Sequence, residues 1–350
     1  MAKSLVGKRI LISIALVGML VVFAAVPAKA AGPVVLRAGA SDPEGTTAPA
    51  LSIGKLCELA TQLSKGELNV QPFYQSLGVE QQLAAGIKAG TIDIGFTATP
   101  NLAPFTDAYL QFDLPFLFKN DRAYIDVLEN HPVGKKALAQ FEKDLGVKVL
   151  VITSHTYDAP VSGTDLMTRN KQAKVPADIK GMKIRTSSTP VEINLMKAYG
   201  ANPTPVQYGQ LYTALQQGVI DGNAATPLPP CASIKLYEVT KYYTAIGFRF
   251  NLLPIYMNKK KFDSLTSSQQ KALLDAAAQV KPLAGQWARD KVKSSIVEYE
   301  KAGVPIYYPT KDEMAQWVSV REKVWKEIAE AFKGKIDLGV ANEIYKLSPR

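Results

Sequence analysis

The side chains that most often carry catalysis are few in this chain and far apart. Its two histidines, His131 and His155, are 24 residues apart, and no HExxH or CxxC spacing is present to hold zinc. The chain also lacks a GxSxG nucleophile turn, a phosphate-binding GK[ST] loop and a GxGxxG turn. We therefore identify no catalytic residue, metal ligand or cofactor site, although two catalytic carboxylates would leave no local signature. His155 could line a cleft, but a hydrogen-bonded structural histidine is the favoured alternative.

The cysteines give little more chemistry. Cys57 and Cys231 are the only two in the chain. Export would permit a disulfide between them. Cys57, however, falls on the apolar face of an expected helix beside Leu56 and Ala60, and such a position favours a free, buried thiol.

The first 30 residues have the pattern of a secretory signal peptide. Lys3, Lys8 and Arg9 precede an apolar run over residues 10–26, and residues 28–30 (AKA) supply the small side chains that signal peptidase needs. A retained membrane anchor is the alternative, but about 17 apolar residues is short for a spanning helix. We expect cleavage near Ala30 and a mature chain in the periplasm.

The charge balance argues against a nucleic-acid partner. The formal charge is +10, and the expected signal peptide supplies four of the basic residues and no acidic ones. The remaining lysines and arginines are spread along the chain, without a basic run interleaved with aromatic residues. The mild positive field that remains would suit a small anionic ligand.

The elements that must position any site alternate between strands and helices. Apolar runs predict strands at 34–39, 68–71 and 92–96, and helical spacing predicts helices at 53–63 and 79–89. This alternation is typical of a parallel sheet with crossover helices. Helices are expected near 121–129 and 133–144, and a further strand at 147–153.

A second block repeats the same pattern. The predicted strands are 182–185, 219–221 and 242–250, and the predicted helices are 190–199 and 208–217. The last hundred residues are expected to be mostly helical, with capping boxes beginning at Thr266 and Thr310 and a kink or break at Pro282.

The predicted fold is α/β, with two lobes and a hinge like those of periplasmic binding proteins. We assign residues 33–155 to the first lobe and 156–250 to the second. Residues 251–350 should return a strand to the first lobe and add a helical C-terminal region that packs across both lobes. The chain should cross between the lobes near 153–165 and again near 250.

Several motifs in a fixed order carry a family resemblance. Residues 176–185 read PADIKGMKIR, 200–205 read GANPTP, 208–218 read YGQLYTALQQG and 219–222 read VIDG. Shorter supporting pieces are SLG at 76–78, GTID at 90–93, DLPF at 113–116 and YMN at 256–258. Together they resemble the DctP-family substrate-binding proteins of tripartite ATP-independent periplasmic (TRAP) transporters over essentially the whole mature chain.

The resemblance implies two ligand contacts in the second lobe. The arginine that closes the PADIKGMKIR strand, Arg185, would hold a ligand carboxylate, for which the planar guanidinium is well shaped. Tyr208 would pack on the ligand in the closed cleft. An interlobe salt bridge for Arg185 and a core position for Tyr208 are the structural alternatives.

The chain departs from the family pattern at two places. Many members have a second arginine before this strand, but alignment puts either Asp165 or Asp158 there, and Arg169 is out of register. A familiar asparagine is replaced by Ala225, so that only Asn223 could partly substitute.

These departures predict a pocket that is less cationic and less polar than in dicarboxylate binders. The expected ligand is therefore a monocarboxylate or a zwitterion with an apolar portion, and an aspartate could meet a donor or ammonium group. In the first lobe, Tyr74, Glu80 and Thr97 are the candidate contacts, together with the less specific Ser41 and Glu44.

The function that follows from the resemblance is capture of a small organic acid by cleft closure and delivery to the membrane subunits of a TRAP transporter. The protein would be a monomer that contacts the inner-membrane permease peripherally. A solute sensor with the same fold and, less favoured, a periplasmic enzyme acting on small acids are the alternatives.

Overall fold

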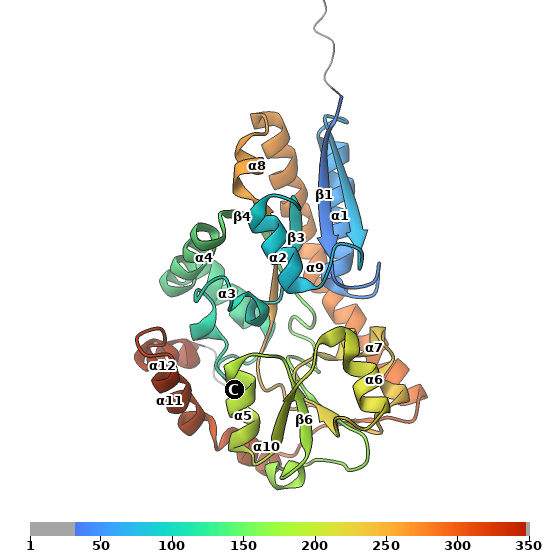
Figure 1. Cartoon of the computed structure of the whole chain (residues 1–350), viewed down its shortest axis with the longest axis vertical. Helices are drawn as coiled ribbons and strands as arrows, with labels where there is room; N and C mark the ends of the chain where they lie inside the picture. The colour runs from blue at the N-terminus through green and yellow to red at the C-terminus, as the bar shows by residue number, and fades with distance from the viewer. Residues whose placement is uncertain (1–31, 348–350) are drawn as a thin grey trace, which may run out of the picture. The chain divides into compact units, whose positions relative to one another are not determined.

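The strands of the computed structural model, which describes residues 32–347, form two separate sheets (Figure 1). The first sheet has the order β2-β1-β3-β10-β4 and the second the order β11-β9-β5-β8-β6-β7. The strands of the first sheet are β1 (Val34–Ala40), β2 (Leu68–Tyr74), β3 (Ile94–Phe96), β4 (Val147–Ser154) and β10 (Leu252–Asn258). Those of the second are β5 (Leu166–Thr168), β6 (Lys183–Thr186), β7 (Asn202–Pro205), β8 (Gly222–Asn223), β9 (Tyr242–Thr244) and β11 (Ile306–Tyr307).

The first sheet begins as the predicted parallel unit. β1 pairs in parallel with β2 and β3, whereas β10 runs antiparallel to both β3 and β4. Leu36 and Ala38 of β1 are fully buried while Arg37 is exposed. Every residue of β10 is buried, as expected of a strand with neighbours on both sides.

Helices cover the first sheet. They are α1 (Ala48–Leu63), α2 (Glu80–Ala89), α3 (Asp121–Asn130), α4 (Pro132–Leu145), α8 (Lys259–Asp263) and the long α9 (Ser267–Lys301). α1 begins where the Thr47 hydroxyl accepts a hydrogen bond from the Ala50 amide at 3.3 Å. Its apolar face, with Ile53 and Leu56 fully buried, packs on β2 and α9.

The second sheet is flanked by shorter helices. They are α5 (Pro190–Ala198), α6 (Leu211–Gln216), α7 (Leu228–Ser233), α10 (Lys311–Val318), α11 (Arg321–Ala331) and α12 (Leu338–Leu347). The predicted capping boxes at Thr266 and Thr310 are confirmed, since each hydroxyl accepts from the amide three residues on. α11 packs against α5 and thereby supports it. The first turn of α5 contains Glu192, which lines the candidate site.

Two loop segments, here called the crossovers, carry the chain between the sheets, and the long α9 carries it across a third time, from β10 to β11. Residues 155–165 lead from β4 to β5, and residues 245–251 lead from β9 back to β10. α9 contacts elements of both lobes: it packs on α1 and β4 of the first and on α7 and β11 of the second. In the first crossover, the ring of Tyr157 lies 5.3 Å from the Arg289 guanidinium of α9. Side chains needed at a junction of the two sheets can therefore come from either crossover.

Four predictions of local structure are corrected. The strand expected at 219–221 is β8 at Gly222–Asn223, and the strand expected at 242–250 ends at Thr244 because residues 245–251 form the crossover. The helix expected at 208–217 divides into a 3₁₀ turn, Tyr208–Gln210, and α6. α9 runs as one continuous helix past Pro282, so the break that was one of the two expectations there does not occur.

Both cysteines are buried and free, as the sequence favoured. Among the described helices, none combines the length and apolar character needed to cross a membrane. The expected signal peptide, residues 1–30, lies outside the described residues.

Candidate functional site

Residues from both lobes and both crossovers line one cavity of about 70 Å³. Its lining includes Asp42, Glu80 and Asn101 from the first lobe, Arg185 and Tyr208 from the second, and His155, Arg249 and Asn251 from the crossovers. A larger hollow of about 410 Å³ adjoins it and shares Glu80, Arg185 and Tyr208. The cavity is thus built like a ligand site between two lobes.

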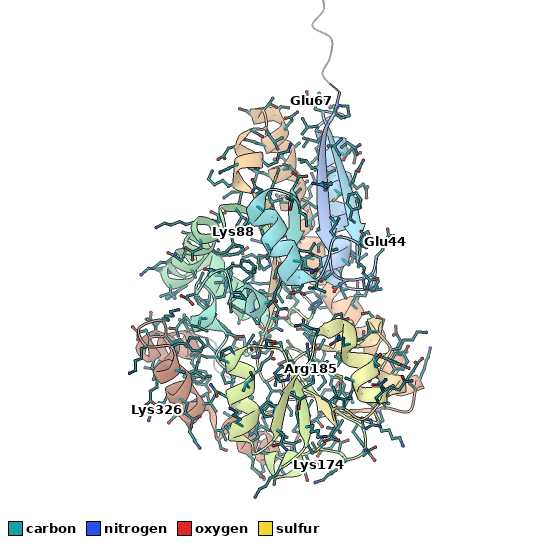
Figure 2. All side chains as sticks on the ribbon, in the orientation of Figure 1. Glu44, Glu67, Lys88, Lys174, Arg185 and Lys326 are labelled. Carbon is teal, nitrogen blue, oxygen red and sulfur yellow. The ribbon has the colours of Figure 1, made fainter. Side chains whose placement is uncertain are left out.

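Arg185 projects from the end of β6 into this cavity; Figure 2 labels it at the end of the second sheet nearest the first. Its Nε donates to the Val206 carbonyl at 2.8 Å, and its Nη1 donates to the Thr226 hydroxyl at 2.9 Å. Burial lowers the pKa of Arg185 to about 10, so the guanidinium remains charged at neutral pH. None of the ion pairs among residues 32–347 includes it.

A single buried cation held only by neutral acceptors is electrostatically incomplete. Charges removed from water are stable only when they are paired and hydrogen-bonded. A ligand carboxylate in the cavity would supply the missing negative charge and accept charge-assisted hydrogen bonds from the guanidinium of Arg185. The site can therefore hold an acid.

Arg249 lines the same cavity and is already compensated. Its guanidinium pairs with Asp113, from the DLPF segment, and with Glu192, from the first turn of α5. All three side chains are nearly inaccessible to solvent. The buried trio joins the loop after Phe112, the second crossover and a second-lobe helix, so it positions the walls of the cavity.

Two carboxyls from the first lobe, those of Glu80 and Asp42, line the same cavity as Arg185. The Oε2 atom of Glu80 accepts from the Ala98 amide and from Nδ2 of Asn101, both at 2.8 Å. Asp42 accepts from the Thr47 hydroxyl. Burial raises the pKa of Glu80 to about 7 and that of Asp42 to about 6.

Tyr208, which the motif predicts to pack on the ligand, lines the cavity. Its hydroxyl donates to the Pro230 carbonyl at 2.8 Å, which fixes the ring against α7. The hydroxyl of Tyr208 is thus hydrogen-bonded within the protein and does not need the ligand as a partner.

Four of the residues predicted as ligand contacts do not line the cavity. Asn223 lies behind Arg185, whose Nη1 is 3.4 Å from its Oδ1. Thr97 is fully buried and bonds the Tyr256 hydroxyl at 2.8 Å, and Tyr74 lies against α1 near Gly54.

Asp165 is the fourth. Its carboxylate accepts from the Tyr243 hydroxyl at 2.6 Å and from the Gly247 amide at 2.7 Å. It therefore ties the two crossovers together instead of facing the cavity. Asp158, the other residue aligned with the missing arginine, pairs with Arg122 and Arg289.

The sequence reasoning missed Arg249, Asn251 and Asp42. No motif surrounds them, and the acids that pair with Arg249 are 136 and 57 residues away in the chain. The one local signal for Arg249 is its position between Phe248 and Phe250. This alternation of apolar and polar residues has the pattern of a strand and gave no indication of a cavity residue. Its position in the cavity depends on tertiary structure alone.

Comparison with known proteins places this geometry in a family. Residues 40–331 match the bacterial extracellular solute-binding protein family 7, DctP. The 2,3-diketo-L-gulonate-binding periplasmic protein YiaO of Escherichia coli is 32% identical over 257 residues, which are 72% of this chain and 74% of that protein.

Two solved TRAP periplasmic solute-binding proteins share the fold. One, from Roseobacter denitrificans with bound β-D-glucuronate, has a TM-score of 0.80 and 23% identity over 90% of this chain and 99% of its own. The other, from Polaromonas sp. JS666 with D-erythronate, has a TM-score of 0.78 and 21% identity over 89% of this chain and 98% of its own. The two-lobed α/β fold is confirmed.

The fold and the interlobe cavity define a solute-binding protein. The chain belongs to the DctP family, the substrate-binding proteins of TRAP transporters, as the sequence motifs predicted.

Proposed function

We propose that this protein binds a small organic monocarboxylate in the periplasm and delivers it to the membrane subunits of a TRAP transporter. The observation that carries the proposal is Arg185, which is buried at the cavity wall, charged and without an acidic partner among the described residues. The ligand carboxylate would take that place.

The charges in the cavity favour one carboxylate on the ligand over two. Arg249 is already paired with Asp113 and Glu192, so Arg185 is the cation left for the ligand. The first-lobe side of the cavity carries the carboxyls of Asp42 and Glu80, which offer a second acid group no cation to pair with. The named relatives bind 2,3-diketo-L-gulonate, glucuronate and erythronate, which supports an acid ligand.

Closure of the cleft explains how binding leads to delivery. The cavity has walls from both lobes, so a ligand that touches Arg185 and the first-lobe loops stabilises the closed arrangement over an open one. The membrane subunits would then recognise the closed form. In this scheme the protein binds and releases its ligand unchanged.

A thermal-shift screen of the mature chain tests the proposal. A ligand that binds only the folded state stabilises it by about 2.7 kcal/mol at 100 times its Kd. The panel compares monocarboxylates with C4-dicarboxylates and with neutral alcohols of matched size. We expect stabilisation by monocarboxylates only; stabilisation that is greatest with a dicarboxylate, or absent with every acid, contradicts the proposal.

A further inference from the structure

Asn223 is the residue of β8 that lies directly beside Arg185. β6 and β8 pair in parallel with Arg185 opposite Asn223, so the two side chains leave the sheet on the same face. Asn223 is fully buried, and its Oδ1 lies 3.4 Å from Nη1 of Arg185. Gly222 lets β8 fit between its neighbours, because a Cβ atom there would collide with the Met167 carbonyl of β5. The fold therefore fixes an amide oxygen next to the guanidinium.

The chain that follows β8 folds around the same guanidinium. The Thr226 hydroxyl accepts a hydrogen bond from Nη1 of Arg185 at 2.9 Å. Oδ1 of Asn223 accepts from the Ala225 amide at 3.4 Å, and Nδ2 of Asn223 lies 3.8 Å from the sulfur of Cys231 in α7. These contacts orient the Asn223 amide with its oxygen toward Arg185 and its nitrogen away from it.

The groups that the protein places on the Arg185 guanidinium are all neutral. Nε donates to the Val206 carbonyl, and Nη1 donates to the Thr226 hydroxyl and the Asn223 amide oxygen. Nη2 makes no hydrogen bond with any residue between 32 and 347. The protein thus fixes two nitrogens of the guanidinium and leaves the third, with the positive charge, to the cavity.

We propose that Asn223 and Thr226 are positioning residues that hold the guanidinium of Arg185 in place without neutralising its charge. Asn223 acts only through Arg185, since it lies behind the cavity and does not line it. Its neutrality then determines specificity, because it makes the site prefer a carboxylate to a neutral group of the same shape. This inference rests on the proposed function, which takes the ligand carboxylate to bind Arg185.

The surroundings of Arg249 show what an acid beside a buried guanidinium does. Asp113 and Glu192 pair with Arg249 and leave it no charge for a ligand. An oxygen 3.4 Å from Nη1 is within ion-pair distance, so a carboxylate in place of the Asn223 amide would pair with Arg185. A ligand acid would then meet a compensated cation and a nearby like charge.

The Asn223→Asp variant tests the charge argument by calorimetric titration. The probes are lactate, butanoate and erythronate, each with its primary amide, which has the same shape without the charge. The wild type should bind at least one of these acids and prefer it to its amide. In Asn223→Asp the affinity for that acid should fall by about 100-fold or more, whereas the affinity for the amide should change only a few-fold. A purely structural defect would weaken both probes alike.

Two substitutions of Thr226 test the orienting role separately. Thr226→Val keeps the size of the side chain but removes the hydroxyl that accepts from Nη1, whereas Thr226→Ser keeps this acceptor. The affinity for the acid should fall by about tenfold in Thr226→Val and stay near that of the wild type in Thr226→Ser. This pair of variants decides the proposal on its own if Asn223→Asp does not fold.

Asn342→Asp is the matched control for the change of charge. Asn342 is exposed on α12 and does not line the cavity. The same substitution there should leave the preference for the acid over its amide unchanged. Melting temperatures without ligand show whether each variant is folded.

The outcomes separate this inference from the proposed function. If Asn223→Asp weakens acid and amide equally or leaves the preference as it is in the wild type, or if Thr226→Val binds the acid as tightly as Thr226→Ser, the positioning role is refuted while carboxylate binding by the wild type stands. If the wild type binds none of the acids, both are refuted.

Discussion

Arg185 and Arg249 line the same cavity, yet only Arg249 is ion-paired within the described part of the chain. Arg249 has two carboxylates as partners, whereas Arg185 is held by the Val206 carbonyl and the Thr226 hydroxyl. The guanidinium of Arg185 is therefore available to a ligand, whereas Arg249 is a structural cation.

Removal of the structural cation should destabilise the fold. Arg249→Met leaves Asp113 and Glu192 as buried carboxylates without a cation, and breaking such a buried arrangement costs about 3–5 kcal/mol. Urea unfolding measures the loss. Arg37→Met, on the exposed face of β1, should change stability by about 0.5 kcal/mol or less. Equal small effects of both substitutions would mean that the trio does not hold the cavity walls together.

Glu80 should make the ligand-free protein less stable as the pH rises. Burial raises the pKa of Glu80 from its ordinary value of 4.5 to about 7. Between these values the folded state keeps a proton that the unfolded state has released, so raising the pH favours unfolding. The stability of the wild type relative to Glu80→Gln should therefore fall from about pH 4.5 to pH 7 and then level off. Urea unfolding of both proteins measures the difference in unfolding free energy, and a difference that does not vary with pH would contradict this prediction. Asp42 and Arg185, the charged groups that act on Glu80, are the same in both proteins.

The ring of Tyr208 should matter more to binding than its hydroxyl. The hydroxyl donates to Pro230, away from the ligand, whereas the ring forms part of the cavity wall. Tyr208→Phe should weaken binding only a few-fold, and Tyr208→Ala by about tenfold or more. Isothermal titration of both variants decides the matter; a larger loss with Phe would show that the hydroxyl acts directly on the ligand.

Both thiols should be unreactive in the folded protein and free in the unfolded one. Burial raises the pKa of Cys57 to about 12 and also raises that of Cys231, so neither forms the reactive thiolate at neutral pH. A colorimetric thiol reagent should detect two thiols per chain only after denaturation without reductant. Detection of none after denaturation would establish a disulfide.

The sequence was sufficient for those parts of the fold whose signal is local. The periodicity at 34–39, 53–63 and 68–71 located β1, α1 and β2, because side-chain burial there follows directly from strand and helix geometry. The strand predicted at 242–250 failed for a physical reason. Alternating Phe248 and Phe250 are buried in a crossover with irregular backbone, and a buried irregular segment can show the same alternation as a strand.

The candidate site was predictable only where a motif contained its residues. Arg185 and Tyr208 belong to the ordered motifs, and both line the cavity. Asp165 was placed by alignment, which does not reveal that Tyr243 and Gly247 donate hydrogen bonds to its carboxylate. Arg249 could not be found, since its partners come from distant parts of the chain.

Titration of a bound carboxylate against Arg185→Lys tests the central claim most directly. Lysine keeps the positive charge but loses the planar pair of donors, so the affinity of the best monocarboxylate should fall by about 10- to 100-fold. The matched Arg37→Lys variant, with its side chain exposed on β1, should bind as the wild type does. Undiminished affinity in Arg185→Lys, with the protein folded, would contradict the assignment of the ligand carboxylate to this guanidinium.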